Sequence, residues 1–281
     1  MPIGRAITLF LIDGTPDGRV ACELINRVGK CVKIPRRLMK ESSNREELWK
    51  AGVYFLFGRD ETSAETNRVY VGEAEEVMKR LPQHNEKEFW SEALVFFSKD
   101  DYLNKAHIKF LEHTICERVA EVGRFQVENG NTPNRPMISE MEQAVMSECF
   151  EDLQLLVGSL GYKLFEPIIS IVVKEQSTEY FSSSARGANA RAIYTNEGMV
   201  VMKGSVIATS IVTSAPEGVQ RLRVSLQSDG TLVEQNSVIT FAKDYLFSSP
   251  SAASGFIQGR SCNGWIEWKD ATGRTLKENE Q

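Results

Sequence analysis

The sequence predicts an α+β fold, and three observations support this prediction. Two apolar runs, Ala6–Ile12 and Arg19–Ile25, flank a dense turn signal, Asp-Gly-Thr-Pro-Asp-Gly at 13–18, which indicates a β-hairpin. Later runs are short and apolar, as in buried strands: Gly52–Phe57, Val69–Gly72 and Ala93–Phe97. Between and after these runs lie segments with helical periodicity. Strands and helices are therefore both expected, in an order that does not alternate strictly.

The longest helical segment is Leu103–Val122. At ~100° per residue its apolar residues fall within about 80° of arc: Ile108, Leu111, Ile115, Val119 and Val122. Glu112 lies at the margin of this stripe, about 60° from its centre. Two interpretations of Glu112 remain open, a carboxylate that looks across at the sheet and a solvated or ion-paired surface glutamate. A second long helix is predicted over Glu140–Leu160, with Gly161 as its C-cap.

Composition excludes several classes of protein. No apolar run approaches the ~20 residues that would span a bilayer, and the N-terminal run resembles a strand that enters a turn, not a signal peptide. The five cysteines are scattered without CxxC spacing, so neither a zinc site nor a disulfide framework is expected. We therefore expect a cytoplasmic protein with reduced thiols and no membrane association.

Charge is distributed unevenly along the chain. The formal net charge is −5, yet residues 1–50 hold ten Lys and Arg against six Asp and Glu, net +4. Residues 51–165 hold twelve against twenty, net −8, and residues 186–281 hold ten against nine, net +1. A nucleic-acid partner would therefore depend on basic residues such as Arg36 and Arg37 in the first segment. A solvated basic loop is the alternative interpretation of that stretch.

The second half of the chain has a different pattern. Residues 166–189 are predicted to be a linker because serine and glycine are frequent there. Residues 190–281 are predicted to form a small α+β domain of short strands, with Asp229-Gly230 as a hairpin turn. Ser249-Pro250 is a typical N-cap and first helical residue, and Asn263-Gly264 indicates a tight turn before a strand over Trp265–Trp268.

An ordered set of residues in the first half carries chemistry. Gly52-Val53-Tyr54 is followed after fifteen residues by Tyr70-Val71-Gly72. Arg80 lies ten residues after Tyr70, and His84 four residues after Arg80. Glu112 follows on the long helix, and Asn134 in the Pro-rich turn after it.

Over residues 51–136 this order resembles the GIY-YIG nuclease family, whose fold is a small mixed central sheet flanked by helices. The resemblance implies a metal-dependent endonuclease in which Glu112 binds Mg²⁺ or Mn²⁺ and Arg80 contacts the scissile phosphate. Tyr70 would be the general base, assisted by Tyr54 and His84. Asn134 would be a nucleic-acid contact. Each of these residues also has an alternative interpretation. Tyr54 and Tyr70 would then be aromatic residues of the core, His84 an exposed histidine, and Asn134 a turn residue that caps a segment.

One position departs from the family pattern. Many members have a lysine after the second tripeptide, whereas this chain has Glu73. An anion there weakens the attraction for phosphate by on the order of 1 kcal/mol, unless Glu73 points away or serves as a second acid near the metal. The chain looks closest to a subset that has Tyr-Ile-Gly-Glu and a later Phe-Trp, here Phe89-Trp90.

The C-terminal segment resembles a domain of unknown function that often accompanies GIY-YIG domains. The shared residues include Asp244-Tyr245, Gly259-Arg260 and Asn263-Gly264-Trp265. Arg260 is a candidate phosphate contact, and Trp265 and Trp268 either stack on bases or belong to a small core. This resemblance implies no chemistry.

The sequence therefore predicts an N-terminal β-hairpin extension (1–50), a GIY-YIG nuclease domain with a C-terminal helix (51–165), the linker (166–189) and the small domain (190–281). The predicted function is an endonuclease that hydrolyses phosphodiester bonds in DNA, with RNA left open. Double-strand cleavage would require two copies, as in a homodimer. The alternative is a catalytically weak or inactive protein of the same fold, with a nucleic-acid-binding or regulatory function. A scaffold without any nucleic-acid role is a third hypothesis.

Overall fold

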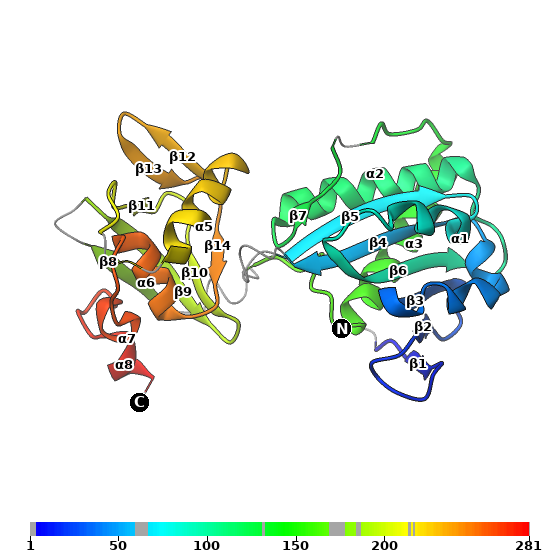
Figure 1. The fold of residues 1–281 in the computed structure, drawn as a ribbon, viewed down its shortest axis with the longest axis horizontal. Helices are drawn as coiled ribbons and strands as arrows, with labels where there is room; N and C mark the ends of the chain where they lie inside the picture. The colour runs from blue at the N-terminus through cyan, green and yellow to red at the C-terminus, as the bar shows by residue number, and fades with distance from the viewer. Residues whose placement is uncertain are drawn as a thin grey trace. The chain divides into compact units, whose positions relative to one another are not determined.

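The computed structural model describes residues 4–59, 67–130, 133–168, 178–183, 187–212, 215 and 217–280. The chain divides into two compact units, Met1–Pro167 and Ile168–Gln281 (Figure 1). Each contains its own sheet and helices, which confirms the predicted α+β class. Half of the predicted linker, at 169–177 and 184–186, lies outside the described residues.

The N-terminal unit is built on a seven-stranded sheet with the order β1-β2-β3-β6-β4-β5-β7. The strands are β1 (Ile7–Leu11), β2 (Val20–Leu24), β3 (Gly29–Pro35), β4 (Gly52–Arg59), β5 (Asn67–Ala74), β6 (Trp90–Ser98) and β7 (Gln126–Val127). The predicted hairpin is confirmed, since β1 pairs antiparallel with β2. Because β3 also pairs with β6, the three strands of the predicted N-terminal extension are part of this sheet and not an appendage to it.

Helices cover the two faces of this sheet. The long helices are α2 (Lys105–Val122) and α3 (Glu140–Ser159), and α1 (Val77–Arg80) is a single turn. Short 3₁₀ helices are η1 (Arg36–Leu38), η2 (Glu41–Asn44), η3 (Glu46–Trp49) and η4 (Leu81–His84). Asn104 caps α2, Gly123 ends it at a positive φ of 68°, and Ser139 caps α3. In Figure 1 the green α2 runs along the cyan β5.

The two-residue period of β4 divides its side chains between two cores. Val53 and Phe55 pack with the residues of α2 and α3. Tyr54 and Leu56 pack on the other face, with residues of α1, η4 and the start of β6. The same alternation puts Val71 on the α2 side of β5 and Tyr70 on the other. Both motif tyrosines therefore belong to the sheet face opposite α2.

The C-terminal unit has a second sheet with the order β12-β13-β11-β9-β10-β14, and β8 pairs with β9. Its strands are β8 (Glu179–Ser183), β9 (Asn189–Thr195), β10 (Gly198–Val201), β11 (Val206–Ile207), β12 (Leu232–Gln235), β13 (Val238–Phe241) and β14 (Tyr245–Phe247). Its helices are α5 (Glu217–Ser228), α6 (Pro250–Gln258), α7 (Gly264–Glu267) and α8 (Leu276–Asn279). Strand β8 lies within the predicted linker, so this unit's sheet begins before residue 190.

Two predictions for this unit are wrong, and one is confirmed. Asp229-Gly230 ends α5 and is not a hairpin turn; the tight β12–β13 turn is Asn236-Ser237, both at positive φ. Trp265–Trp268 is largely helical, because the Asn263 side chain accepts the Trp265 N–H as an N-cap. Ser249 caps α6 as predicted, with Pro250 as the first helical residue. Trp268 is fully buried in the core, whereas Trp265 is exposed.

No helix among the described residues is both long and apolar enough to cross a membrane.

Candidate active site

The structure brings three of the predicted site residues into one aromatic cluster. Tyr54 from β4, Tyr70 from β5 and His84 at the end of η4 have ring centroids 4.8–6.2 Å apart. The segment that holds His84 is fixed by the buried Trp90 Nε1–H, which donates to the His84 carbonyl at 3.0 Å. Residues distant in sequence thus converge as the ordered motif predicts.

A buried hydrogen bond of 2.8 Å joins the Tyr54 hydroxyl to His84 Nε2. Burial is the main cause that raises the pKa of Tyr54 far above its ordinary value, and Tyr70 adds to the effect while Arg80 opposes it. Burial, and then Lys87 and Arg80, lower the pKa of His84 to about 4. At neutral pH Tyr54 is therefore a neutral phenol that is hydrogen-bonded to a neutral imidazole.

The lowered pKa of His84 predicts a pH-dependent stability. The unfolded chain takes up a proton near pH 6.5, whereas folded His84 does so only near pH 4. The contribution of neutral His84 is fully present above pH 6.5 and falls as the pH drops toward 4, by at most about 3 kcal/mol. Urea unfolding at pH 7.5 and 4.5 measures this loss. His84→Gln should lose less stability over the same interval, and parallel losses would contradict the prediction.

Gly72 allows the Tyr54 ring to lie against β5. A Cβ on Gly72 would meet the ring Cζ of Tyr54 at 2.4 Å and its hydroxyl at 2.5 Å. Both atoms belong to a ring that is buried and hydrogen-bonded, so it has little room to move. The close approach of the Tyr54 ring therefore explains why the second tripeptide has a glycine at position 72.

We expect Gly72→Ala to destabilise the N-terminal unit by about 1–3 kcal/mol, because the added methyl overpacks the buried ring. Urea unfolding followed by tryptophan fluorescence measures the change. Gly130→Ala is the matched control, since a Cβ on Gly130 would meet nothing within 4 Å. Equal stabilities of the two variants would show that the ring can move aside.

Arg80, at the end of α1, places its guanidinium beside the tyrosines. Its interaction with the Tyr54 phenol is the main cause that raises the pKa of Arg80, and Tyr70 contributes as well. Gln83 also accepts a hydrogen bond from Arg80 Nη1. Because the residue is exposed, the guanidinium remains accessible to an anion.

Lys87 is a cation at this cluster that the sequence did not indicate. Its Nζ lies 3.9 Å from the centroid of the Tyr70 ring, a cation–π arrangement. Burial lowers the pKa of Lys87. No periodicity or motif spacing marks the position, since its loop is placed only by tertiary contacts.

One of those contacts is made by Arg36, predicted to bind nucleic acid. Arg36 donates to the carbonyls of Asn85, Lys87 and Trp90 at 2.7–3.0 Å. Its guanidinium also stacks 4.4 Å from the Trp90 ring centroid. The structure thus gives Arg36 a structural role, because its donors hold the loop that carries Lys87.

Glu112 reaches the same region at the open edge of β5. Backbone groups of Val69 and Val71 face this edge, where Glu128 N–H and the Asn129 amide bind them. By the two-residue period the Glu73 N–H faces it too, and it interacts with the Glu112 carboxylate. Burial, followed by the Glu73 carboxylate, raises the pKa of Glu112 to about 7.

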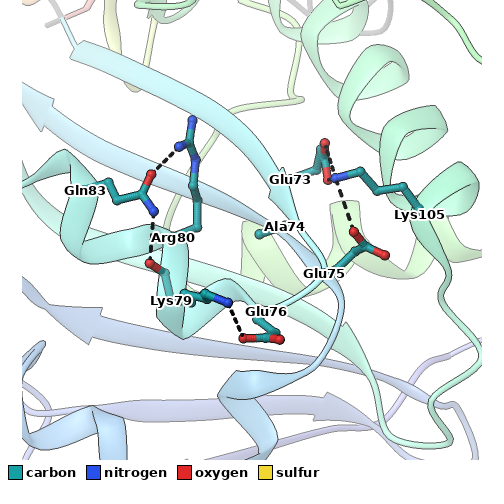
Figure 2. Close-up of a pocket in the computed structure, with 8 residues that line it drawn as sticks. All are labelled: Glu73, Ala74, Glu75, Glu76, Lys79, Arg80, Gln83 and Lys105. Atoms are coloured by element: carbon teal, nitrogen blue, oxygen red, sulfur yellow. Dashed lines mark hydrogen bonds and ion pairs between the residues drawn. The ribbon is translucent and has the colours of Figure 1, made fainter.

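An open depression of about 370 Å³ lies between Arg80, which contacts the tyrosines, and Glu73, which interacts with Glu112 (Figure 2). Arg80 lines one part of it, and Glu73 and Lys105 line another. Lys105 Nζ lies 2.8 and 2.9 Å from the two Glu73 oxygens. The departure from the family pattern at Glu73 is therefore neutralised by a lysine from α2, which the sequence did not indicate as a site residue.

Neither Arg37 nor Asn134 lines this depression. Arg37 is exposed and pairs with Asp17 at 3.3 Å. Asn134 is exposed on the connection to α3, next to Pro133, whose carbonyl accepts from His113 Nδ1 at 2.7 Å. Arg260 belongs to the C-terminal unit and donates to Gln258 and Glu267 at 2.9 and 2.8 Å.

Comparison with known proteins identifies one family. Residues 180–280 match a family described as a domain of unknown function, DUF4357. This match partly supports the predicted C-terminal resemblance and covers most of the second unit. No curated protein and no solved structure matches the chain.

Proposed function

We propose that the N-terminal unit is a GIY-YIG-type endonuclease that hydrolyses phosphodiester bonds in DNA with the help of a divalent cation. The observation that carries this proposal is the convergence of Tyr54, Tyr70, His84 and Arg80 from separate segments. Glu112 interacts with Glu73, which lines the same depression as Arg80. Phosphodiester hydrolysis needs such a set: a proton acceptor, a donor to phosphoryl oxygens and an acidic ligand.

The donor set near Glu112 fits Mg²⁺ or Mn²⁺. Both prefer carboxylate oxygens and keep bound waters, so one or two carboxylates suffice. Glu112 would hold the ion, and a dication would relieve both the burial of this carboxylate and its repulsion from Glu73, the two causes that raise its pKa. Among the described residues no group of three His, Cys, Asp or Glu side chains is placed to hold a metal. Such an ion supplies charge neutralisation and activates a bound water.

The side chains of the cluster divide the remaining work. Arg80 would hold two oxygens of the scissile phosphate with its planar guanidinium. Tyr70 would accept the proton of the attacking water. Tyr54 and His84 are both neutral at pH 7, so they position Tyr70 through ring contacts and do not compete for that proton.

The proposed partner is DNA, with RNA as a second substrate to test. The protein would act in the cytoplasm, and Arg37 and Arg260 remain proposed nucleic-acid contacts. One unit with one Arg80 makes one cut per binding event, so double-strand cleavage would require two copies of the chain.

A catalytically weak or inactive protein of the same fold is the second candidate. The Glu73–Lys105 ion pair favours it, because the cation that would attract phosphate is bound to an acid. This candidate predicts DNA binding without turnover.

Glu112→Gln tests the choice between the two. We expect wild-type protein to nick supercoiled plasmid with Mg²⁺ and not with EDTA. Loss of the anionic ligand should lower the nicking rate about tenfold to a hundredfold, in part by weakening metal affinity. Agarose-gel time courses at several Mg²⁺ concentrations measure the rate.

Glu121→Gln is the matched control, since this exposed glutamate lies on the same helix and pairs with Arg118. It should nick like the wild type. Equal rates for the Glu112 and Glu121 variants would refute the assignment of Glu112, and DNA binding without nicking by the wild type would favour the second candidate.

A further inference from the structure

The placement of Lys105 is not explained by its own helix. It is the first residue of α2, where the helix dipole disfavours a cation, and α2 has no acidic residue in its first turn. A lysine at this position is stabilised by an anionic partner from outside the helix.

That partner is Glu73 on β5. The Lys105 ammonium lies 2.8 and 2.9 Å from the two carboxylate oxygens of Glu73 and 4.0 Å from Glu75. The Glu73 side chain is 13% exposed and that of Lys105 45%. Figure 2 shows Lys105 extending from α2 toward Glu73 at the depression. The ammonium therefore lies over a mostly buried carboxylate at a surface opening.

Glu112 is close to the same ion pair. It lies seven residues after Lys105 on α2, about two helical turns further on and on the same face. Burial and then the Glu73 carboxylate raise the pKa of Glu112, Lys105 lowers it, and the Glu73 N–H interacts with the Glu112 carboxylate. A second acid thus lies near the ion pair, in the region where the proposed function requires a dication.

We propose that Lys105 is a built-in counter-ion of Glu73 and Glu112 that the divalent cation displaces, and that the displaced ammonium then binds DNA phosphate. This inference rests on the proposed function. An ammonium and a dication at the same carboxylate repel each other, so each weakens the binding of the other. After displacement Lys105 still lies at the depression lined by Arg80, where the phosphate would bind. Metal binding thereby makes a phosphate-binding cation available.

The first experiment measures Mn²⁺ binding to the full chain without DNA, by the EPR signal of free Mn²⁺. Lys105→Met removes the competitor, and we expect Mn²⁺ to bind about fivefold to tenfold more tightly, as for the loss of a partly exposed ion pair. Lys79→Met is the matched control. Lys79 lines the same depression but pairs with Glu76, so its variant should bind within about twofold of the wild type.

The outcomes separate this inference from the proposed function. Unchanged or weaker binding by Lys105→Met overturns the inference. If Glu112→Gln nevertheless abolishes binding, the proposed metal site stands alone. Absence of Mn²⁺ binding in both the wild type and Lys105→Met overturns both. Equal tightening by the two lysine variants overturns the inference as well, because it would show only a general charge effect.

The second experiment measures affinity for a short random-sequence DNA duplex at several salt concentrations, in a Tyr70→Phe background that slows cleavage. With Mn²⁺, Lys105→Met should reduce the slope of log affinity against log salt by about 0.9, the value for one phosphate contact. Without Mn²⁺ the slopes should agree. The phosphate role of Lys105 is overturned if Lys105→Met and its parent protein have the same slope with Mn²⁺. It is also overturned if their slopes differ equally with and without Mn²⁺.

Discussion

Tyr70→Phe is expected to lower the plasmid-nicking rate by about 10²–10⁴-fold, the range for loss of a general base. The substitution removes only the hydroxyl and leaves the ring contacts with Tyr54 and His84 and the cation–π contact with Lys87. DNA affinity should therefore stay within about twofold of the wild type, since the variant keeps every charge. Single-turnover nicking and DNA binding, measured side by side, test this separation.

Two further tyrosine variants make the result specific. Tyr102→Phe is the exposed control, on the segment before α2, and should nick like the wild type. Tyr54→Phe removes the hydroxyl that is hydrogen-bonded to His84 Nε2 and should lower both stability and rate. If Tyr70→Phe nicks at the wild-type rate, another group is the base.

Arg80→Ala is expected to lower the nicking rate by about 10²–10³-fold, as for removal of one donor to a developing anionic charge. Arg80 is an exposed residue, so the substitution should lower stability only by about 0.5–1.5 kcal/mol, through loss of its interaction with the Tyr54 phenol. Arg80→Lys should recover only part of the rate, since an ammonium cannot donate two parallel hydrogen bonds to phosphate. The rate is measured under single-turnover conditions at saturating Mg²⁺.

Lys79→Ala is the control for Arg80, because it removes a neighbouring cation at the same depression. Its rate should fall only through weaker DNA binding, and excess protein should restore it. Should excess protein also restore Arg80→Ala, the role of Arg80 would be binding and not stabilisation of the transition state.

Local patterns predicted most of the elements that surround the site. The hairpin, β4 to β6 and the two long helices have uninterrupted apolar spacing or clear caps, as at Asn104 and Ser139. Strand β3 was not predicted because Lys30 and Lys33 interrupt its apolar residues, and only pairing with β2 and β6 decides its conformation. Helix α5 was missed although Val219, Leu222 and Leu226 have helical spacing.

The residues of the candidate site that belong to an ordered sequence motif could be predicted. Those that only the folding of the chain brings to the site could not. Tyr54, Tyr70 and His84 converge because their motif spacing matches the geometry of adjacent strands and the following turn. Lys87 and Lys105 carry no such signal, since their partners lie on other elements. The basic stretch did not indicate that the Arg36 guanidinium binds carbonyls inside the protein, and its predicted contact with nucleic acid stays a prediction.

The position of Glu112 at the edge of β5 gives this residue a second role. An open strand edge invites another chain to extend the sheet. Here Glu128 and Asn129 form hydrogen bonds with the backbone groups of Val69 and Val71, and the Glu112 carboxylate interacts with the backbone N–H of Glu73. The proposed metal ligand therefore also ends the hydrogen bonding along this strand edge. The same carboxylate would bind the metal ion and protect the edge against the addition of a strand from another molecule.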